Sequence, residues 1–545
     1  MGRWGDGEMG RWGDGGMGRW GPDSRFPIPD SRFPIPDSRF PIPDSRFPIP
    51  DSRFPIPDSR FPIPDSRFPI PDSRFPIPDS RFPIPDSRFP IPDSRFPIPD
   101  SRFPIPDSRF PIPDSQFPIP LDNSQNLNVI VIGGGAAGFF GAITCATTHP
   151  HTNVTLLEAS RHPLSKVRIS GGGRCNVTHS CFDPAQLVQA YPRGSKALRG
   201  AYTRFQPKDT IAWFGAHGVE LKTEADGRMF PITDSSETIV DCLLQVAKRA
   251  GVNIRTSNPV KWISRQFSQH PTPDTPHQTP GGFEIGLRNG ETIKCDRVLV
   301  ATGSNPLGYR WAKALGHTIE TPVPSLFTFN IPDSRLQDLA GVSVKQVCLK
   351  LPDAGKTLKE QTGPLLITHW GLSGPVVLKL SAWGARVLHE HHYQMPLLVN
   401  WLPDYNPDRL RKLLLDVKSQ LPRRFITTSC PIPIPKRLWV SLVTSVGVGS
   451  ENRWAELSKK TVHQLVQELT QGRYLIQGKG VFKEEFVTCG GVSLKEVNFK
   501  TMESRQCPGL YFAGEILDID GITGGFNFQS AWTTGWLGGQ GIGNS

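Results

Sequence analysis

The stretch NVIVIGGGAAGFFGAITCATT, residues 128–148, decides the fold of this chain. Four apolar residues, Val129 to Ile132, predict a buried strand, and the small residues that follow the glycines recur at helical spacing. Between them stands the pattern Gly133-x-Gly135-x-x-Gly138. A glycine triplet in this position, after a strand and before a helix, is typical of a βα unit that binds a dinucleotide.

Each glycine of this pattern has a physical task. Gly133 permits the tight turn, Gly135 lets a pyrophosphate approach the backbone, and Gly138 lets the helix pack closely on the strand. Ala136 and Ala137 open the helix, whose free N–H groups and positive dipole end attract phosphate. We therefore expect an α/β fold with a Rossmann-like domain.

A second strand, within NVTLLEAS, ends at Glu158, twenty residues beyond Gly138. A carboxylate at this place binds ribose hydroxyl groups and repels a 2′-phosphate. The cofactor at this site is therefore expected to be FAD or NAD rather than NADP. A third strand, RVLVATGS at 297–304, is expected to join the same sheet, with Gly303 close to the ligand.

The segment SKVRISGGGRCNVTH, residues 165–179, combines glycines with cations and predicts a loop that cradles the cofactor. Its expected contacts are backbone N–H groups and positive side chains, from Lys166, Gly172, Gly173, Arg174, Cys175 and Asn176. The Cys175 thiol could be redox-active, but we favour a small residue packed beneath a ring.

The C-terminal stretch GLYFAGEILDIDGITGGFNFQSAW, residues 509–532, favours FAD over NAD. It predicts a strand over 510–513, a glycine-rich turn, and a helix beginning near Asn527. The ribityl chain and ring system of a flavin need a distant second segment of this kind, and a helix N-terminus would stabilise the negative charge of reduced flavin. The expected contacts are Gly514, Glu515, Asp518, Gly524, Gly525 and Asn527.

With these motifs in view, the body resembles the BaiN-like and aminoacetone-oxidase-like flavoproteins, a family of FAD-dependent oxidoreductases. Further shared blocks are GRMFPITDSS (227–236), THWGLSGPVVLKLSA (368–382) and TCGGVSLKEVNFKTMES (488–504). The resemblance implies a glutathione-reductase-like FAD domain made of residues 128–318 and 481–545, interrupted by a mixed β/α insert at 319–480. His179 stands where this family pattern leads us to expect asparagine.

The primary functional hypothesis is a two-electron oxidoreductase in which N5 of non-covalent FAD exchanges hydride with a small-molecule substrate. A single dinucleotide fingerprint is present, so a separate NAD(P)H domain is not expected; NADH or NADPH, if it is a transient reductant, has to reach the flavin face itself. No residue declares itself as the acid or base; the candidates are His369, Arg174 and Cys175. The substrate, the electron acceptor and the oligomeric state stay open.

The first 124 residues are of low complexity. The heptapeptide PDSRFPI recurs fourteen times between Pro22 and Ile119, with Gln116 in the last copy. Two prolines in each repeat exclude regular helix and sheet, so a disordered tail is expected. We favour a neutral repeat expansion or an upstream start codon over a functional arm. An adaptor protein whose repeat arm is the active part stays as an alternative.

Charge leaves a further alternative open. The whole chain has a formal net charge of +11. Residues 1–127 contribute −2, so the body, residues 128–545, has a net charge of +13. Because the Lys and Arg are scattered without a dense run, we do not expect a nucleic-acid partner. The alternative function is a basic flavoprotein that acts on or binds tRNA.

The nine cysteines form no CxxC pair and no Cys/His ligand spacing, which predicts reduced thiols and no metal site. No apolar run approaches the roughly 20 residues of a membrane span. The expected location is the cytoplasm.

Overall fold

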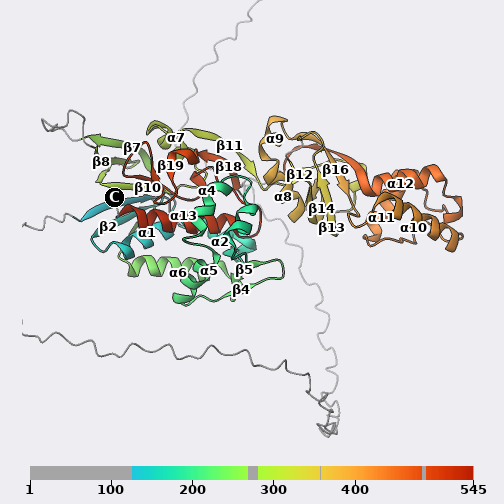
Figure 1. The fold of residues 1–545 in the computed structure, drawn as a ribbon, viewed down its shortest axis with the longest axis horizontal. Helices are drawn as coiled ribbons and strands as arrows, with labels where there is room; N and C mark the ends of the chain where they lie inside the picture. The colour runs from blue at the N-terminus through green and yellow to red at the C-terminus, as the bar shows by residue number, and fades with distance from the viewer. Residues whose placement is uncertain (1–125, 268–279, 356–357, 481–486, 544–545) are drawn as a thin grey trace, which may run out of the picture. The chain divides into compact units, whose positions relative to one another are not determined.

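The computed structural model describes residues 126–543, except for 268–279, 356–357 and 481–486. The expected disordered tail, residues 1–124, lies outside the described residues. The described part contains α/β architecture with a Rossmann-like sheet and additional sheets, as the glycine motif predicts (Figure 1).

The largest sheet has seven strands in the order β19-β20-β21-β10-β1-β2-β6. Its five strands from β21 to β6 pair in parallel, and β20 and β19 continue the sheet in antiparallel pairing. Val131 of β1 lies opposite Leu299 of β10 and Leu156 of β2. The strands are β1 Leu127–Ile132, β2 Thr152–Leu157, β6 Asn253–Arg255, β10 Arg297–Val300, β19 Val497–Asn498, β20 Glu503–Ser504 and β21 Leu510–Phe512.

Two long helices from opposite ends of the body lie side by side against this sheet. They are α1, Ala136–Thr148, and α13, Phe526–Ile542 (Figure 1). Glycines allow the close approach: a Cβ on Gly535 would lie 2.6 Å from the Ala137 carbonyl oxygen, and one on Gly539 would lie 2.6 Å from the Gly141 carbonyl oxygen. The helices therefore meet backbone to backbone.

Smaller elements surround the sheet. A three-stranded sheet, β7-β8-β9, leads into β10, and another, β3-β5-β4, is formed by strands from residues 174–235. The strands are β3 Thr178–His179, β4 Leu221–Thr223, β5 Arg228–Pro231, β7 Val260–Phe267, β8 Pro280–Leu287 and β9 Thr292–Cys295. The helices are α2 Ser165–Gly173, α3 Pro184–Leu187, α4 Ser195–Tyr202, α5 Pro207–Ala216, α6 Ser236–Arg249 and α7 Pro306–Ala314.

Residues between α7 and β19 form two further sheets. The first pairs β11, Ile319–Ser325, with β18, Val487–Val492, in antiparallel register. The second has six strands in the order β12-β15-β14-β13-β16-β17 and shares a core with α8, α10, α11 and α12. Its strands are β12 Phe329–Asn330, β13 Ser343–Lys350, β14 Gln361–Thr368, β15 Gly371–Ser373, β16 Gln394–Asn400 and β17 Gly472–Gln477.

We call residues 319–480 the insert, since they separate β10 from β21 of the large sheet. Alternation in β17, where every second residue is buried, matches a sheet covered on one face. Apolar residues at helical spacing place Leu410 and Leu414 of α10 in the core. The helices of the insert are α8 Pro375–Trp383, α9 Ala385–Glu390, α10 Pro407–Gln420, α11 Lys436–Ser445 and α12 Lys459–Gln471.

The close contact of α1 with α13 gives a testable prediction. Gly535→Val should lower the free energy of unfolding by about 3 kcal/mol, because the new side chain must push the two backbones apart. Urea denaturation followed by circular dichroism measures this loss. The control is Gly215→Ala in α5, where a Cβ meets nothing within 4 Å and stability should hold or rise. Equal stability of both variants would refute the packing argument.

Candidate functional site

The glycine-rich segments converge at one edge of the large sheet. Gly133 follows β1, Glu158 follows β2, Gly303 lies just after β10, and Gly514 lies just after β21. These four strands run parallel, so their carboxyl ends share one edge. In open α/β sheets this edge is the usual place for a ligand.

The turn from β1 into α1 has the geometry of a phosphate site. Gly133 has a φ of 111°, and a Cβ on it or on Gly138 would clash with backbone carbonyl groups, so neither position accepts another residue. A Cβ on Gly135 would instead meet nothing within 4 Å. Helix α1 begins without a side-chain cap and without an acid in its first turn. Its first N–H groups are therefore available to an anion.

Glu158 is held at the end of β2 by three hydrogen bonds. Its Oε2 accepts from the Gly134 N–H at 2.7 Å, and its Oε1 accepts from both the backbone N–H and the hydroxyl of Ser160, each at 2.7 Å. A carboxylate has about four acceptor positions, so one stays for a ribose hydroxyl. The carboxylate is thus fixed beside the phosphate turn.

The prediction of a cradling loop at 165–179 is partly wrong in its secondary structure, because residues 165–173 form helix α2. Residues from Ser165 onward form a helical turn, and the chain leaves helical geometry only at Ser170. Gly171, Gly172 and Gly173 then adopt φ of 58°, 71° and 83°. A Cβ on Gly172 or Gly173 would meet nothing within 4 Å, so these two glycines also border open space.

The cations of this segment are paired with acids. Lys166 Nζ lies 2.7 Å from Glu515, Arg168 lies 2.6 Å from Glu237, and Arg174 lies 2.7 Å from Glu224. The guanidinium of Arg174 also stacks 4.0 Å above a phenylalanine ring, that of Phe230. Arg174 therefore orders the neighbouring β4–β5 hairpin, which weakens its candidacy as a substrate-binding cation.

Cys175 and Asn176 support the cradle from behind. The Cys175 side chain is fully buried, and burial raises the pKa of its thiol to about 12. A buried thiol of this kind is inert, in line with a packing role. With its amide oriented to satisfy both neighbours, Asn176 accepts from the Gly525 N–H at 2.9 Å and donates to the Thr178 carbonyl oxygen at 3.1 Å.

The C-terminal segment closes the site through Glu515. This residue belongs to a short 3₁₀ turn, Gly514–Ile516, and its carboxylate binds Lys166 and accepts from the Thr488 N–H at 2.9 Å. A Cβ on Gly303 would lie 3.5 Å from Glu515 Oε2. Glu515 therefore joins α2, β18 and the end of β10 at the ligand edge.

The turn before α13 is built from two glycines with positive φ, Gly524 at 134° and Gly525 at 90°. Asn527 pins this turn, because its side chain accepts from the Gly521 N–H at 2.8 Å and donates to the Gly521 carbonyl oxygen at 2.9 Å. Like α1, α13 starts without a side-chain cap and without an acid in its first turn. Two uncapped helix N-termini thus belong to one site.

A buried polar network that sequence reasoning missed holds the start of α13. Gln529 Oε1 accepts from the hydroxyls of Thr178 at 2.5 Å and Thr210 at 3.0 Å, and its amide donates to Thr533 at 3.0 Å. All four side chains are buried. The sequence feature that could have indicated this network is the pair Gln529 and Thr533, four residues apart in an otherwise apolar, glycine-rich helix, because buried polar side chains need hydrogen-bond partners.

The two aspartates of the DID motif have different surroundings. Asp520 is fully buried, forms a bidentate ion pair with Arg193, and accepts from the Ser325 hydroxyl at 2.7 Å. Arg193 also donates to the Ala382 carbonyl oxygen at 2.7 Å, so this pair ties β11 and α8 to the turn that precedes α13. Asp518 lies 3.4 Å from Arg386, and burial raises the pKa of its carboxyl.

The two histidines of interest also differ. His369 is exposed in the turn between β14 and β15, and its ring centroid lies 6.5 Å from that of Trp370. His179 stacks on Phe526, with 4.6 Å between ring centroids, and lies at the start of α13. Burial lowers the pKa of His179. The structure therefore places His179, and not His369, beside the predicted flavin helix.

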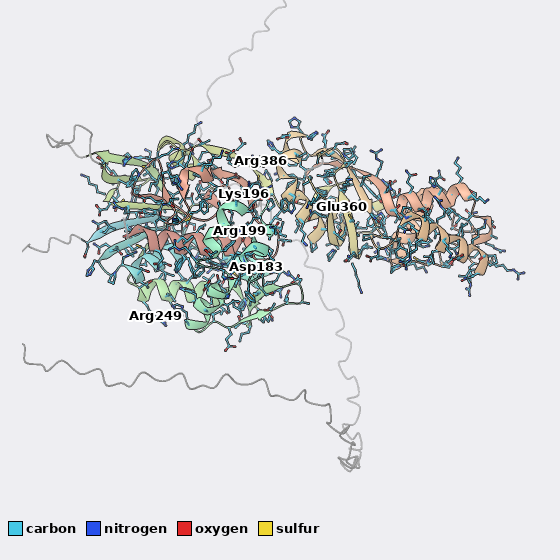
Figure 2. All side chains as sticks on the ribbon, viewed as in Figure 1. Asp183, Lys196, Arg199, Arg249, Glu360 and Arg386 are labelled. Carbon is cyan, nitrogen blue, oxygen red and sulfur yellow. The ribbon has the colours of Figure 1, made fainter. Side chains whose placement is uncertain are left out.

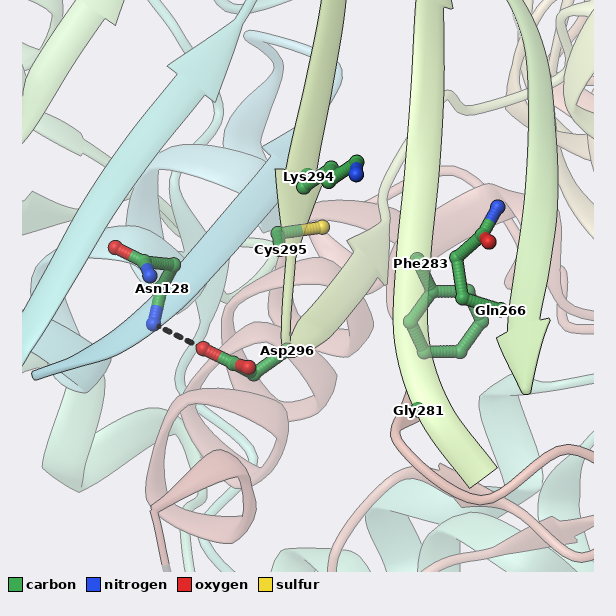
Figure 3. Close-up of a pocket in the computed structure, with 7 residues that line it drawn as sticks. All are labelled: Asn128, Gln266, Gly281, Phe283, Lys294, Cys295 and Asp296. Carbon is green, nitrogen blue, oxygen red and sulfur yellow. Dashed lines mark hydrogen bonds between the residues drawn. The ribbon is translucent and has the colours of Figure 1, made fainter. Parts of the chain in front are cut away.

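A small crevice lies away from this edge. It has a volume of about 130 Å³ and lies beside β9, where the Asn128 N–H donates to Asp296 at 2.8 Å (Figure 3). Ligand pockets are usually about 300–1,000 Å³, so this crevice is too small for a flavin. It shares no residue with the glycine cradle.

Other expectations can be compared with the described residues. All nine cysteines are free. No group of metal-ligating side chains occurs within the described ranges, and none of the helices described there is long and apolar enough to span a membrane.

Comparison with known proteins agrees with this geometry. The model of the family described as HI0933-like protein Rossmann domain matches residues 127–541. A ribosomal RNA dihydrouridine synthase of Escherichia coli is 30% identical over 426 residues, which are 76% of this chain and 97% of the relative. The protein of the same name from Haemophilus influenzae is also 30% identical, over 76% of this chain and 98% of the relative.

A relative with another substrate is similar over the same length. The 3-dehydro-bile acid delta(4,6)-reductase of Clostridium scindens is 28% identical over 418 residues, which are 75% of this chain and 97% of the relative. The similarity to all three proteins spans nearly their whole length.

The open space at Gly135 allows a sharp test of the cofactor site. Its φ of −92° suits any residue, so Gly135→Ala should leave the stability of the ligand-free chain unchanged. Affinity for FAD should fall at least about tenfold, because the new methyl group occupies space needed by the pyrophosphate. Fluorescence titration with FAD and thermal denaturation measure the two effects. Unchanged FAD affinity would contradict the assignment of the pyrophosphate to this turn.

The buried ion pair gives a second prediction. Asp520→Ala should lower the free energy of unfolding by about 3 kcal/mol, because it leaves the Arg193 guanidinium buried without its partner. Urea denaturation is again the measurement. Glu237→Gln, which breaks the exposed pair with Arg168, is the control and should leave the denaturation midpoint nearly unchanged. A small effect of Asp520→Ala would mean that Arg193 finds water or another acceptor.

Proposed function

Since this chain belongs to the HI0933-like family, a family of FAD-dependent oxidoreductases, we propose that it reduces a carbon–carbon double bond conjugated with a carbonyl group. The observation that carries the cofactor assignment is the pair of uncapped helix N-termini, α1 and α13, at one glycine-lined edge. Open space at Gly135, Gly172 and Gly173 gives FAD room that no side chain of the chain uses.

The names of the relatives support the reaction class. A dihydrouridine synthase saturates a ring double bond of uracil next to a carbonyl, and a delta(4,6)-reductase saturates double bonds conjugated with a ketone. Each such reduction adds a hydride to the carbon of the conjugated double bond that is farther from the carbonyl, which is the β carbon in uracil and the β or δ carbon in a dienone, and a proton to its neighbour. FAD held at this edge would supply that hydride from its N5 atom when reduced.

The residues of the chain have separate tasks in this proposal. The N-terminus of α1 binds the pyrophosphate, and Glu158 accepts from a ribose hydroxyl. The N-terminus of α13 favours the negative charge that the flavin pyrimidine gains on reduction. Glu515 and Lys166 fix α2 against β18, and the Gln529 network holds α13 in place.

NADH or NADPH is proposed as the source of electrons. A second dinucleotide fingerprint is missing from the sequence, so the nicotinamide would have to bind in turn with the substrate at the same flavin. The oxidised double-bond substrate then accepts the hydride in the second half of the cycle.

A uracil ring in RNA is the substrate candidate that an independent observation favours. The body has a net charge of +13, and two of its relatives are named for ribosomal RNA. The tRNA alternative has no comparable support, because no relative reported above is named for tRNA. A free 3-oxo steroid is the competing candidate and needs no basic surface.

An anaerobic absorption experiment tests the proposal. The full chain, loaded with FAD, should show two visible bands that bleach on addition of NADH or NADPH. An added conjugated enone or uridine-containing RNA should then restore the bands, because it takes up two electrons. The Gly135→Ala variant, which should bind FAD more weakly, serves as the control and should show weaker bands at the same FAD concentration. Bands that persist would exclude nicotinamide as reductant, and a chain that cannot take up FAD would contradict the proposed function.

A further inference from the structure

The positive charge of the body is concentrated in the insert. Residues 320–480 contain 20 Lys and Arg but 12 Asp and Glu, so they supply +8 of the body's +13. The bias is strongest over 404–460, with 11 cations and 5 acids. This segment contains α10, α11 and the start of α12.

The fold brings distant cations of this segment together. The turn after α10 lies against residues 453–455, because the Trp454 N–H donates to the Arg424 carbonyl oxygen at 3.0 Å. Lys418 donates to the Leu457 carbonyl oxygen at 2.6 Å, and Arg411 contacts His463 of α12 at 3.4 Å. We call these neighbouring cations the basic strip: Arg411, Arg423, Arg424, Arg453, Lys459 and Lys460.

Few acids of the segment form ion pairs with the cations of the basic strip. Asp408 reaches Arg411 only at 3.8 Å, and the Glu456 carboxylate accepts from Asn452 and from the Arg453 backbone N–H. In the part of the chain that the structure describes, no ion pair engages Arg423, Arg424, Lys459 or Lys460, and all four are exposed. Their charge is therefore directed to solvent.

Two further features of the basic strip cost stability unless a binding partner covers it. Lys459 and Lys460 occupy the first positions of α12, where the helix dipole disfavours cations. Leu421 and Phe425 lie beside the arginines with 42% and 39% of their surface exposed, and the Arg453 guanidinium lies 5.8 Å from the Phe425 ring centre. Arginines interleaved with an exposed aromatic ring match RNA, which offers phosphates and unpaired bases.

We propose that the basic strip is the docking surface for an RNA substrate, with phosphates on the cations and an unpaired base on Phe425. The inference rests on the proposed reduction of a uracil ring and adds the surface that would hold the surrounding RNA. It revises the expectation, drawn from the scatter of Lys and Arg along the sequence, that nucleic acid is not a partner. The fold brings cations that are distant in sequence onto neighbouring segments. A small steroid would make no use of this surface.

The test compares two variants of the full, FAD-loaded chain. The strip variant is Arg423→Gln/Arg424→Gln/Lys459→Gln/Lys460→Gln. The control variant, Lys248→Gln/Arg249→Gln/Arg288→Gln/Lys313→Gln, removes the same charge from exposed positions of the FAD domain; Arg249 is labelled in Figure 2. Binding of a labelled, mixed-sequence, single-stranded RNA is measured by fluorescence anisotropy over a range of NaCl concentrations.

The strip variant should lose at least about tenfold in affinity, and the slope of log affinity against log salt should fall by about 3, since each phosphate contact contributes about 0.7. The control variant should change affinity less than about threefold. Phe425→Ala should weaken binding about tenfold at an unchanged salt slope, because stacking releases no counterions. Equal slopes for the strip and control variants would overturn the proposal.

Flavin bleaching by NADH or NADPH is recorded on the same samples, and it should be unaffected in the strip variant. A chain that bleaches but does not bind RNA would overturn the docking surface and leave the reductase intact. A chain that binds RNA through the strip but holds no flavin would support the surface and overturn the proposed function. Strip-dependent binding to phosphatidylserine vesicles without binding to RNA would overturn the proposal in favour of a lipid surface.

Discussion

The contact between α1 and α13 is the constraint on which the site depends. Two helices that begin at opposite ends of the body lie within touching distance of each other's backbones because Gly141, Gly535 and Gly539 carry no side chains there. The two helices run in the same direction: Ala137, at the start of α1, lies against Gly535, and α13 begins nine residues earlier, about 13 Å beyond this contact. A ligand with a phosphate at one end and a reducible ring at the other needs the N-termini of both helices. Cofactor binding would therefore depend on the packing of α1 against α13.

Local chemistry made the dinucleotide half of the site predictable. Gly133 and Gly138 leave no room for a Cβ, Gly135 borders open space, and Glu158 stands at the end of the next strand, as the spacing implies. These features lie within about thirty residues of one another and follow from turn geometry alone. The start of α13 was equally readable, because glycines at positive φ precede it.

Partners distant in sequence were not predictable. Lys166 and Arg174 look like phosphate ligands in the sequence, yet acids from other segments, Glu515 and Glu224, neutralise them. Asp520 belongs to the same acidic, glycine-rich stretch, but its partners Arg193 and Ser325 and its burial place it at the junction with the insert. Single-sequence patterns report spacing along the chain, whereas the pairing of charges depends on which segments the fold brings together.

The paired strands β11 and β18 have a consequence for how such enzymes diversify. Ile319 faces Val492 and Ser325 faces Val487, so the chain enters and leaves the insert at neighbouring points about 5 Å apart. A short turn could replace everything between them without moving the large sheet. Changes in sequence between the two strands can therefore alter the surface of the insert while the strand pair holds its ends in place.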